Sequence, residues 1–259
     1  MEVKKMDKFK KFVLFPLLTI TLFFSVFFLF LQINYYPPIL MYHSLGTPPV
    51  ETPQVEKEIF KQQLRYLKEH GFKVILVEEL AESIKKRKIE RKVVAITFDD
   101  GYKNNLEAAE LLKEFGFPAT IFVIVNKINE EGYLGEEDLK YILANTPVNI
   151  GSHTLNHKYL PSLSLFELEK EIFLSKKILE NMLGREINAF SYPLGGFNRE
   201  ALKIVEKAGY KCGFTTNRGK GKNIFALKRI KITNNDVGLN LWAKLSGFYH
   251  IFKRARRPY

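Results

Sequence analysis

The sequence has little cysteine. Cys212 is the single thiol among 259 residues, so the chain cannot form an internal disulfide. The sequence also lacks internal repeats, and its one low-complexity stretch is an apolar run near the start. A His-Glu-x-x-His pattern, the helical zinc motif of many metallopeptidases, is absent as well. These absences exclude a fold held by internal disulfides and argue against a peptidase of that type.

Acidic residues are scarce at both ends of the chain, which carries a formal net charge of +12. Residues 1–11 contain five lysines and two acidic residues, and the tail at residues 253–257 contains four basic residues. Outside these two segments 31 basic residues stand against 26 acidic ones, a net charge of +5. This balance does not indicate a nucleic-acid-binding protein.

Charged residues are absent from residues 12–31, a run rich in Phe and Leu. A run of this length can cross a hydrocarbon core of about 30 Å, and the preceding lysines favour a cytoplasmic N-terminus. A cleaved signal peptide is the alternative, although the residues after the run offer no small-residue cleavage site. We therefore expect a cytoplasmic basic segment at 1–11, an uncleaved transmembrane anchor at 12–33, and an extracytoplasmic remainder.

The remainder alternates short apolar runs with amphipathic stretches. Strands are predicted over residues 39–43, 74–76, 93–98, 119–125, 148–151, 189–192, 211–215 and 229–232. Helices are predicted over residues 55–70, 77–86, 106–115, 136–144, 165–183, 199–208 and 239–252. Repeated strand–helix units predict an α/β fold with a parallel sheet and helices outside. Their number, about seven or eight, favours a closed barrel over an open sheet.

We expect this barrel to occupy residues 37–236, followed by an amphipathic helix and basic tail at 237–259. Two interpretations of that last helix stay open. It could pack on the barrel, as most amphipathic helices do, or it could make a second contact with the membrane surface or with an anionic polymer.

Polar residues follow the predicted strands at their C-terminal ends. His43 ends the first strand, Asp99 and Asp100 end the strand at 93–98, and His153 follows the strand at 148–151. In a parallel barrel these ends gather on one face, and that face carries the active site. We therefore expect these residues to converge although they are far apart in the chain.

The residue types at this face indicate metal-dependent hydrolysis. Asp99 and Asp100 end an extended strand, so their side chains point to opposite sides and can serve different purposes. His153 and His157 are four residues apart, and on a helical turn they would lie on one side and share a metal. With Asp100 they would form a two-histidine, one-carboxylate site with open positions, a known catalytic zinc arrangement. Asp99 could then take a proton from an activated water.

Two stretches carry a family resemblance. Thr97-Phe98-Asp99-Asp100-Gly101 and Ser152-His153-Thr154-x-x-His157 resemble the first two motifs of the polysaccharide deacetylases, carbohydrate esterase family four. The resemblance implies a distorted (β/α) barrel that removes N- or O-acetyl groups from polysaccharides. It also implies that Asp99 is the general base and that Asp100, His153 and His157 hold a divalent metal, with zinc as first choice and cobalt or nickel as alternatives.

The third motif departs from the commonest family pattern. In Phe190-Ser191-Tyr192-Pro193-Leu194-Gly195 no arginine precedes the proline, and Leu194 stands in place of an aromatic residue. This form, and the stretch ending at His43, resemble the branch that deacetylates poly-β-1,6-N-acetylglucosamine. By that resemblance the Leu194 backbone N–H binds the developing oxyanion, and Tyr192, Pro193 and Gly195 bind substrate. The alternative is that Tyr192-Pro193 merely ends a strand.

The general acid has two candidates, His43 and His250. His43 is favoured because it lies at the expected barrel mouth. In the poly-β-1,6-N-acetylglucosamine branch, the histidine at the corresponding position resembles a general acid. His250 instead falls within the last helix. Arg229, counted among the substrate-binding residues, could orient Asp99 in place of the missing arginine or could be an ordinary surface arginine.

These features together predict a membrane-anchored, extracytoplasmic N-deacetylase whose partners are the membrane and an N-acetylated polysaccharide. The branch resemblance favours poly-β-1,6-N-acetylglucosamine as that polymer. Peptidoglycan or a chitin-like glycan is the alternative substrate, and a non-catalytic glycan-binding protein on the same fold is the alternative class. The oligomeric state is left open.

Overall fold

A computed structural model describes residues 2–46, 54–216 and 223–251. The chain forms two compact units, Met1–Tyr35 and Tyr36–Tyr259. The predicted basic tail at 253–257 lies outside the described residues.

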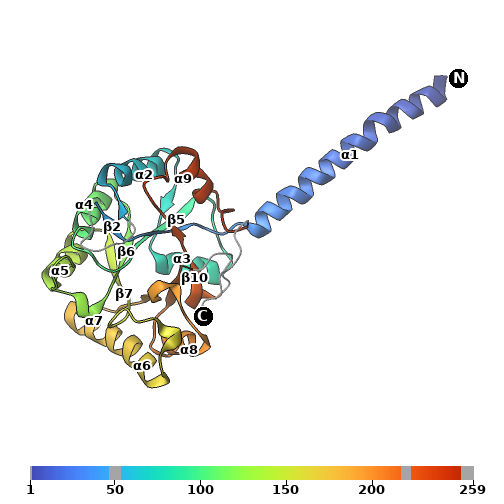
Figure 1. Cartoon of the computed structure of the whole chain (residues 1–259). Coiled ribbons are helices and arrows are strands. Elements are labelled where there is room, and N and C mark those ends of the chain that lie inside the picture. Colours follow the sequence, from blue (N-terminus) through green and yellow to red (C-terminus); the bar gives the residue numbers. More distant parts are fainter. Residues whose placement is uncertain (1, 47–53, 217–222, 252–259) are drawn as a thin grey trace. The chain divides into compact units, whose positions relative to one another are not determined.

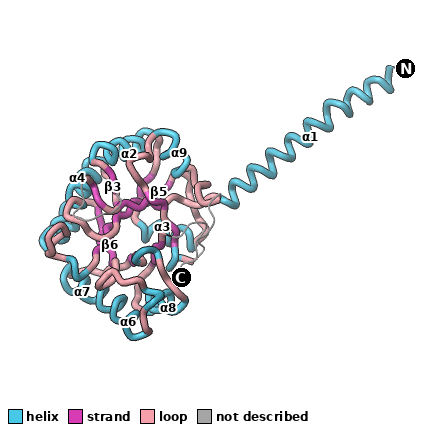
Figure 2. Tube along the Cα trace, viewed as in Figure 1, coloured by secondary structure: helices cyan, strands magenta, loops and turns pink. Residues whose placement is uncertain are grey.

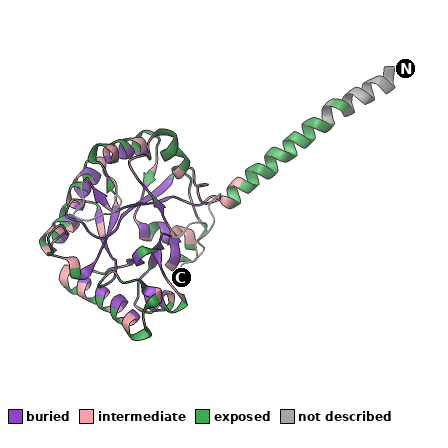
Figure 3. Ribbon diagram, in the orientation of Figure 1, coloured by how far each residue is buried: buried purple, intermediate pink, exposed green. Residues whose placement is uncertain are grey.

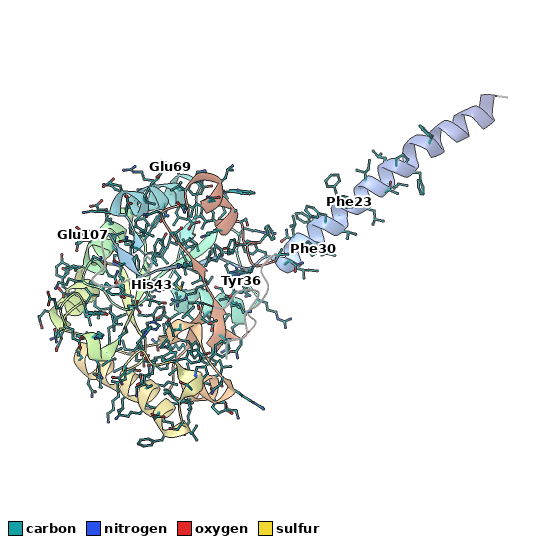
Figure 4. All side chains as sticks on the ribbon, viewed as in Figure 1. Phe23, Phe30, Tyr36, His43, Glu69 and Glu107 are labelled. Carbon is teal, nitrogen blue, oxygen red and sulfur yellow. The ribbon has the colours of Figure 1, made fainter. Side chains whose placement is uncertain are left out.

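The first unit is a single helix, α1 (Glu2–Asn34). Its described apolar side chains are exposed, and phenylalanines such as Phe23 and Phe30 project from it (Figure 4). In the described part of the chain it is the one helix long and apolar enough to cross a membrane, over Phe15–Asn34. These bounds lie within three residues of the span predicted from the sequence.

The second unit is built on a parallel sheet of nine strands, which Figure 1 shows ringed by helices. The strand order is β10-β9-β8-β7-β6-β5-β1-β11, with β4 paired to β5 off this path. The strands are β1 (Ile39–Tyr42), β4 (Lys73–Val74), β5 (Val93–Phe98), β6 (Ala119–Val123), β7 (Val148–Ser152), β8 (Ala189–Ser191), β9 (Cys212–Thr215), β10 (Leu227–Lys228) and β11 (Ile230–Lys231). All strand pairings in this sheet are parallel among the described residues. The predicted barrel is confirmed as a nearly closed one.

Helices alternate with the strands, and most of them cover the outside of the barrel (Figure 2). They are α2 (Lys57–Glu69), α3 (Val77–Lys85), α4 (Asn105–Phe115), α5 (Glu136–Asn145), α6 (Leu165–Glu169), α7 (Ser175–Leu183), α8 (Arg199–Lys207) and α9 (Gly238–Leu245). A π-helical turn, Lys170–Leu174, joins α6 to α7 within the long helix predicted from the sequence. A short pair, β2 (Ser44–Leu45) and β3 (Gln54–Val55), forms a separate small sheet that was not predicted.

The helix α3 differs from the others in where it packs. Its buried residues Val77, Leu80 and Ala81 belong to the same apolar cluster as Phe122 of β6 and Phe214 of β9. The cluster contains alternate residues of the strands, because successive side chains of a strand face opposite sides. The other face of each strand packs against the outer helices (Figure 3). An apolar plug that includes α3 therefore fills the barrel interior.

The last helix is shorter than predicted. α9 ends at Leu245, because Gly247 takes a left-handed conformation with φ of 77° and turns the chain. Leu241 and Leu245 pack on the barrel, but Trp242 is 58% exposed. The described part of this helix thus agrees with the packed interpretation, and its apolar face is only partly covered.

Candidate active site

The carboxyl ends of neighbouring strands bring the predicted polar residues together. His43 follows β1, Asp99 and Asp100 follow β5, and His153 follows β7. Because β7, β6, β5 and β1 are adjacent in the sheet, these side chains share one mouth of the barrel.

Asp100, His153 and His157 form a compact group of donor atoms. The Asp100 Oδ1 atom lies 3.5 Å from the Nε2 atom of each histidine, and the three ligand atoms lie within 4.8 Å of one another. Asp100 and His153 are buried, whereas the His157 side chain is 31% exposed. The group therefore faces the solvent on the His157 side.

The protonation of this group suits a cation. Burial lowers the pKa of His153 to about 3 and also lowers the pKa of His157, so both imidazoles are neutral at pH 7. Burial raises the pKa of Asp100 to about 6. The His153 Nδ1–H donates to the Ser191 carbonyl at 2.8 Å, which leaves the Nε2 lone pair directed to Asp100. Two neutral imidazoles and a carboxylate are a donor set that fits a divalent metal.

The loop that carries the two histidines is not the helical turn predicted from their spacing. Thr154 and His157 have positive φ values of 68° and 58°, so the chain curls through left-handed conformations. Glu171, 2% exposed, holds this curl. Its carboxylate accepts hydrogen bonds from the backbone N–H groups of Leu155 and Asn156 and from the Asn156 side chain, at 2.8–3.1 Å.

Glu171 was missed in the sequence. It occupies the π-helical turn, an irregularity often found at functional sites. A signal for it existed, because Leu168 and Ile172 mark the buried face of the predicted helix and Glu171 lies on that face. A carboxylate on a buried face predicts a hydrogen-bonding or charged partner, since acidic residues are seldom fully buried without one.

Glu171→Ala is expected to lower the free energy of unfolding by about 3 kcal/mol, because it leaves buried N–H groups of the histidine loop without an acceptor. Glu171→Gln should recover part of that loss. Chemical denaturation of both variants measures the effect. The matched control is Glu169→Ala, which removes a neighbouring carboxylate that is 42% exposed. Equal losses for Glu171→Ala and Glu169→Ala would contradict the anchoring role.

Asp99 lies in a separate network behind the donor group. Its two carboxylate oxygens each accept a 2.6 Å hydrogen bond from the Arg229 guanidinium. Arg229 also donates to Ser191 Oγ at 2.9 Å and to Thr97 Oγ1 at 3.2 Å, and its guanidinium lies 5.5 Å from the centre of the Phe122 ring. The network fixes the orientation of the Asp99 carboxylate.

The charge state of Asp99 follows from this pairing. Burial alone would raise its pKa, but the positive charge and hydrogen bonds of Arg229, together with the nearby His153 and His43, outweigh burial and hold the pKa of Asp99 well below its usual value. Both side chains are almost fully buried. The surface interpretation of Arg229 is therefore wrong. Its predicted contact with substrate stays a prediction, and the buried guanidinium is engaged by Asp99.

The third motif forms a tight turn after β8. The Tyr192 side chain is buried and its hydroxyl donates to the Phe225 carbonyl at 2.9 Å, so this side chain supports the turn. Pro193 and Gly195 are buried as well. Leu194 has a left-handed backbone with φ of 55°, and its side chain is 71% exposed. Of the four residues, Leu194 is the one that faces solvent.

The two histidines proposed as general acids lie at opposite ends of β1. His43 follows the carboxyl end, and burial lowers its pKa, opposed by the charges of Asp99 and Asp100. His250 packs against Tyr36, which precedes the amino end, with ring centres 5.6 Å apart. Figure 4 labels Tyr36 and His43. The extended stretch from Tyr36 to His43 is about 20 Å long, so His250 lies far from the donor group.

His250 should influence stability at low pH. Burial, assisted by the charge of Lys228, lowers its pKa to about 4, below the value of about 6.5 in an unfolded chain. Its neutral form therefore stabilises the fold above pH 6.5, and this contribution is lost as the pH falls towards 4. The free energy of unfolding should fall over that range by up to about 3 kcal/mol more in the parent than in His250→Gln.

Urea unfolding at several pH values measures this difference. The rings of Tyr36 and Tyr249 pack on His250. His70→Gln, at an exposed position, is the matched control. The same pH dependence in the parent and in His250→Gln would contradict the prediction.

A parallel barrel with an acid–histidine cluster at its carboxyl mouth has the arrangement of a hydrolase whose site could hold a metal, and sequence comparison identifies the family. A profile of the polysaccharide deacetylases matches residues 86–213. A Bacillus subtilis (strain 168) protein assigned to the polysaccharide deacetylases is 35% identical over 201 residues, which cover 76% of this chain and 71% of that protein. The chain belongs to the polysaccharide deacetylase family.

Two further similarities agree with this assignment. The poly-β-1,6-N-acetyl-D-glucosamine N-deacetylase of Staphylococcus aureus (strain MSSA476) is 26% identical over 226 residues, covering 81% of this chain and 78% of that protein. A solved Streptococcus pyogenes deacetylase in complex with acetate matches with a TM-score of 0.75 and 29% identity, covering 81% of this chain and 97% of that one. The protein is thus a deacetylase, a hydrolase, as predicted.

Proposed function

We propose that this protein is a metal-dependent N-deacetylase of extracytoplasmic poly-β-1,6-N-acetylglucosamine, anchored to the membrane. The observation that carries the proposal is the pairing of two sites at one mouth: an ionised Asp99 held by Arg229, beside the donor group Asp100, His153 and His157. A non-catalytic glycan-binding protein would have no need for a fixed, ionised carboxylate beside a metal-binding group.

Asp100, His153 and His157 would hold the metal, with zinc as first choice and cobalt or nickel as alternatives. When bound, such a metal supplies a Lewis acid that polarises the acetamide carbonyl and lowers the pKa of water. Ser191 keeps His153 in the tautomer that offers Nε2, and Glu171 keeps the histidine loop in place.

The other residues divide the proton transfers between them. Asp99 accepts the proton of the attacking water, and Arg229 holds the carboxylate ionised and correctly oriented. The Leu194 N–H donates to the oxyanion of the tetrahedral intermediate. His43, at the same mouth, has a lowered pKa and is neutral at rest, so the proton that it passes on originates from the attacking water. The carbon–nitrogen bond breaks, the departing glucosamine nitrogen takes this proton, and acetate leaves.

The substrate assignment rests on the branch-like third motif and on the Staphylococcus aureus relative, which is named for poly-β-1,6-N-acetyl-D-glucosamine. The location rests on α1 and the lysines before it. We assign residues 1–11 to the cytoplasm, 12–33 to the membrane anchor, 37–236 to the catalytic domain and 237–259 to a C-terminal helix and basic tail.

The test is acetate release by the full chain in lipid nanodiscs. The protein is treated with chelator, and zinc, cobalt or nickel is then added back with oligomers of β-1,6- or β-1,4-linked N-acetylglucosamine. We expect chelation to abolish release, metal to restore it, and the β-1,6 oligomer to react faster. Preference for the β-1,4 oligomer would redirect the assignment to peptidoglycan or chitin-like glycans. Stoichiometric metal without release from either oligomer would contradict N-deacetylation of both.

His157→Ala should weaken zinc binding by at least about 100-fold, because it removes one of three ligands, a larger change than the loss of a supporting partner. Zinc titration monitored by calorimetry measures the affinity. His70→Ala is the matched control, since the His70 side chain is exposed and, among the described residues, bonds only to the nearby Tyr66 carbonyl. Unchanged affinity in His157→Ala would contradict the assigned ligand set.

A further inference from the structure

A basic loop, residues 85–92, follows the plugging helix α3. It contains six Lys or Arg residues and one acidic residue, Glu90. Each of these seven side chains is exposed. The loop therefore carries a net charge of +5, which equals the net charge of the whole chain outside its two basic ends. Apart from these segments the chain is electrically balanced, so the charge is concentrated at one place.

The structure leaves most of this charge uncompensated by the protein. Lys86 forms an ion pair with Glu82 at 3.0 Å, and Glu90 forms an ion pair with Lys73 at 3.7 Å. Within the described ranges, Lys85, Arg87 and Lys88 make no ion pair. Like charges held together in this way repel one another, and an anionic partner offsets this repulsion. The partner must lie within about 10 Å, the Debye length, because salt screens exposed charges over longer distances.

The position of the loop points to the partner. In the register of the parallel pair β1 and β5, Ile39 lies opposite Ala95. Tyr36 and Lys92 each precede that pair by three residues, so both lie at the same amino end of neighbouring strands. The basic loop thus ends beside the first residue of the barrel unit.

A second set of contacts also places the basic loop beside Tyr36. The Arg91 guanidinium lies 5.5 Å from the centre of the Phe248 ring. The preceding residue, Gly247, accepts a 3.0 Å hydrogen bond from the Tyr36 N–H. The loop, the segment after α9 and Tyr36 are therefore neighbours at the amino end of the barrel.

Chain connectivity then relates this end to the bilayer. Only Tyr35 separates Tyr36 from Asn34, the last residue of α1 and of its apolar span. One intervening residue allows a separation of about 7 Å at most. If α1 is the membrane anchor proposed above, Tyr36 and its neighbours are held close to the headgroups.

We propose that the basic loop, residues 85–92, docks the barrel on anionic lipid headgroups of the membrane that α1 spans. The inference rests on the proposed anchoring by α1 and goes beyond it, because an anchor alone leaves the barrel free to turn. Each Lys or Arg close to an anionic surface strengthens binding about five-fold. Docking by this end directs the carboxyl mouth, which carries the active site, away from the lipid.

The test is hydrogen–deuterium exchange of the full chain in nanodiscs of phosphatidylcholine, with or without phosphatidylglycerol. We expect backbone exchange across residues 85–92 to slow at least about five-fold in the anionic nanodisc and to recover in high salt. The variant K85Q/R87Q/K88Q should lose the slowing. The matched control K113Q/K140Q/K203Q removes equal charge from exposed helix positions elsewhere, and this variant should still show the slowing of exchange.

Equal exchange in the two nanodiscs would overturn the proposal. Slowing by a soluble anionic polymer in neutral nanodiscs, without slowing by anionic lipid, would overturn it in favour of a polymer partner. Acetate release from soluble oligomers is measured on the same samples. Normal acetate release with equal exchange in the two nanodiscs would contradict the docking proposal but not the proposed function. Absence of acetate release in every sample would contradict the proposed function.

Discussion

Asp99→Asn is expected to release acetate about 1,000-fold more slowly than the parent, because it removes the carboxylate proposed as the general base. The variant should also be less stable. Asparagine leaves the fully buried Arg229 guanidinium without its counter-charge, so the free energy of unfolding should fall by about 3 kcal/mol. Acetate release and urea unfolding, measured on the same preparation, give the two effects.

A double variant separates catalysis from stability. Asp99→Asn combined with Arg229→Met removes both charges, and it should regain most of the stability lost in Asp99→Asn. It should remain as inactive as the single variant. Release within ten-fold of the parent by either variant would contradict the assignment of Asp99 as general base.

Arg229→Met is expected to lower the free energy of unfolding by about 3–5 kcal/mol, because the Asp99 carboxylate is left buried without its partner. The turnover number should fall about 100-fold, since the carboxylate is no longer held in orientation. Arg229→Lys should recover part of the stability but little of the turnover, because lysine cannot reproduce the two-pronged contact with both Asp99 oxygens.

Separate measurement of kcat and KM decides which role Arg229 has. A buried residue that positions Asp99 should change kcat and leave KM nearly unchanged. A raised KM with unchanged kcat would instead show direct binding of the polymer, the role assigned to Arg229 from the sequence. The matched control is Arg185→Met, which removes an exposed arginine away from the carboxyl mouth.

The sequence was sufficient to predict the barrel and the convergence of its polar residues. Both predictions depend on locating the ends of the strands. These ends can be predicted because buried parallel strands such as 93–98 are continuous apolar runs. The spacing of His153 and His157 predicted that they would meet, but for an incorrect reason. They meet on a left-handed loop, and that loop depends on Glu171, which is distant in the chain.

Arg229 shows why the rest could not be predicted. The missing arginine of the third motif could be noticed in the sequence, and Arg229 was named as a replacement that could orient Asp99, but the sequence did not distinguish this role from that of an ordinary surface arginine. Arg229 lies between β10 and β11, which pair with opposite ends of the sheet. Only the near-closure of the barrel brings this residue to Asp99, 130 positions earlier in the chain. Local pattern carries no information on that contact.

The apolar plug that includes α3 has a consequence for product release. Val77, Leu80 and Phe122 fill the interior, so the barrel offers no passage from the active site to its amino end. Acetate must therefore leave through the same opening by which the polymer enters. While a long chain lies across that opening, the small anion has to diffuse out beside it. Product escape and movement of the polymer are thereby coupled, and short oligomers should be less subject to this constraint than the full polymer.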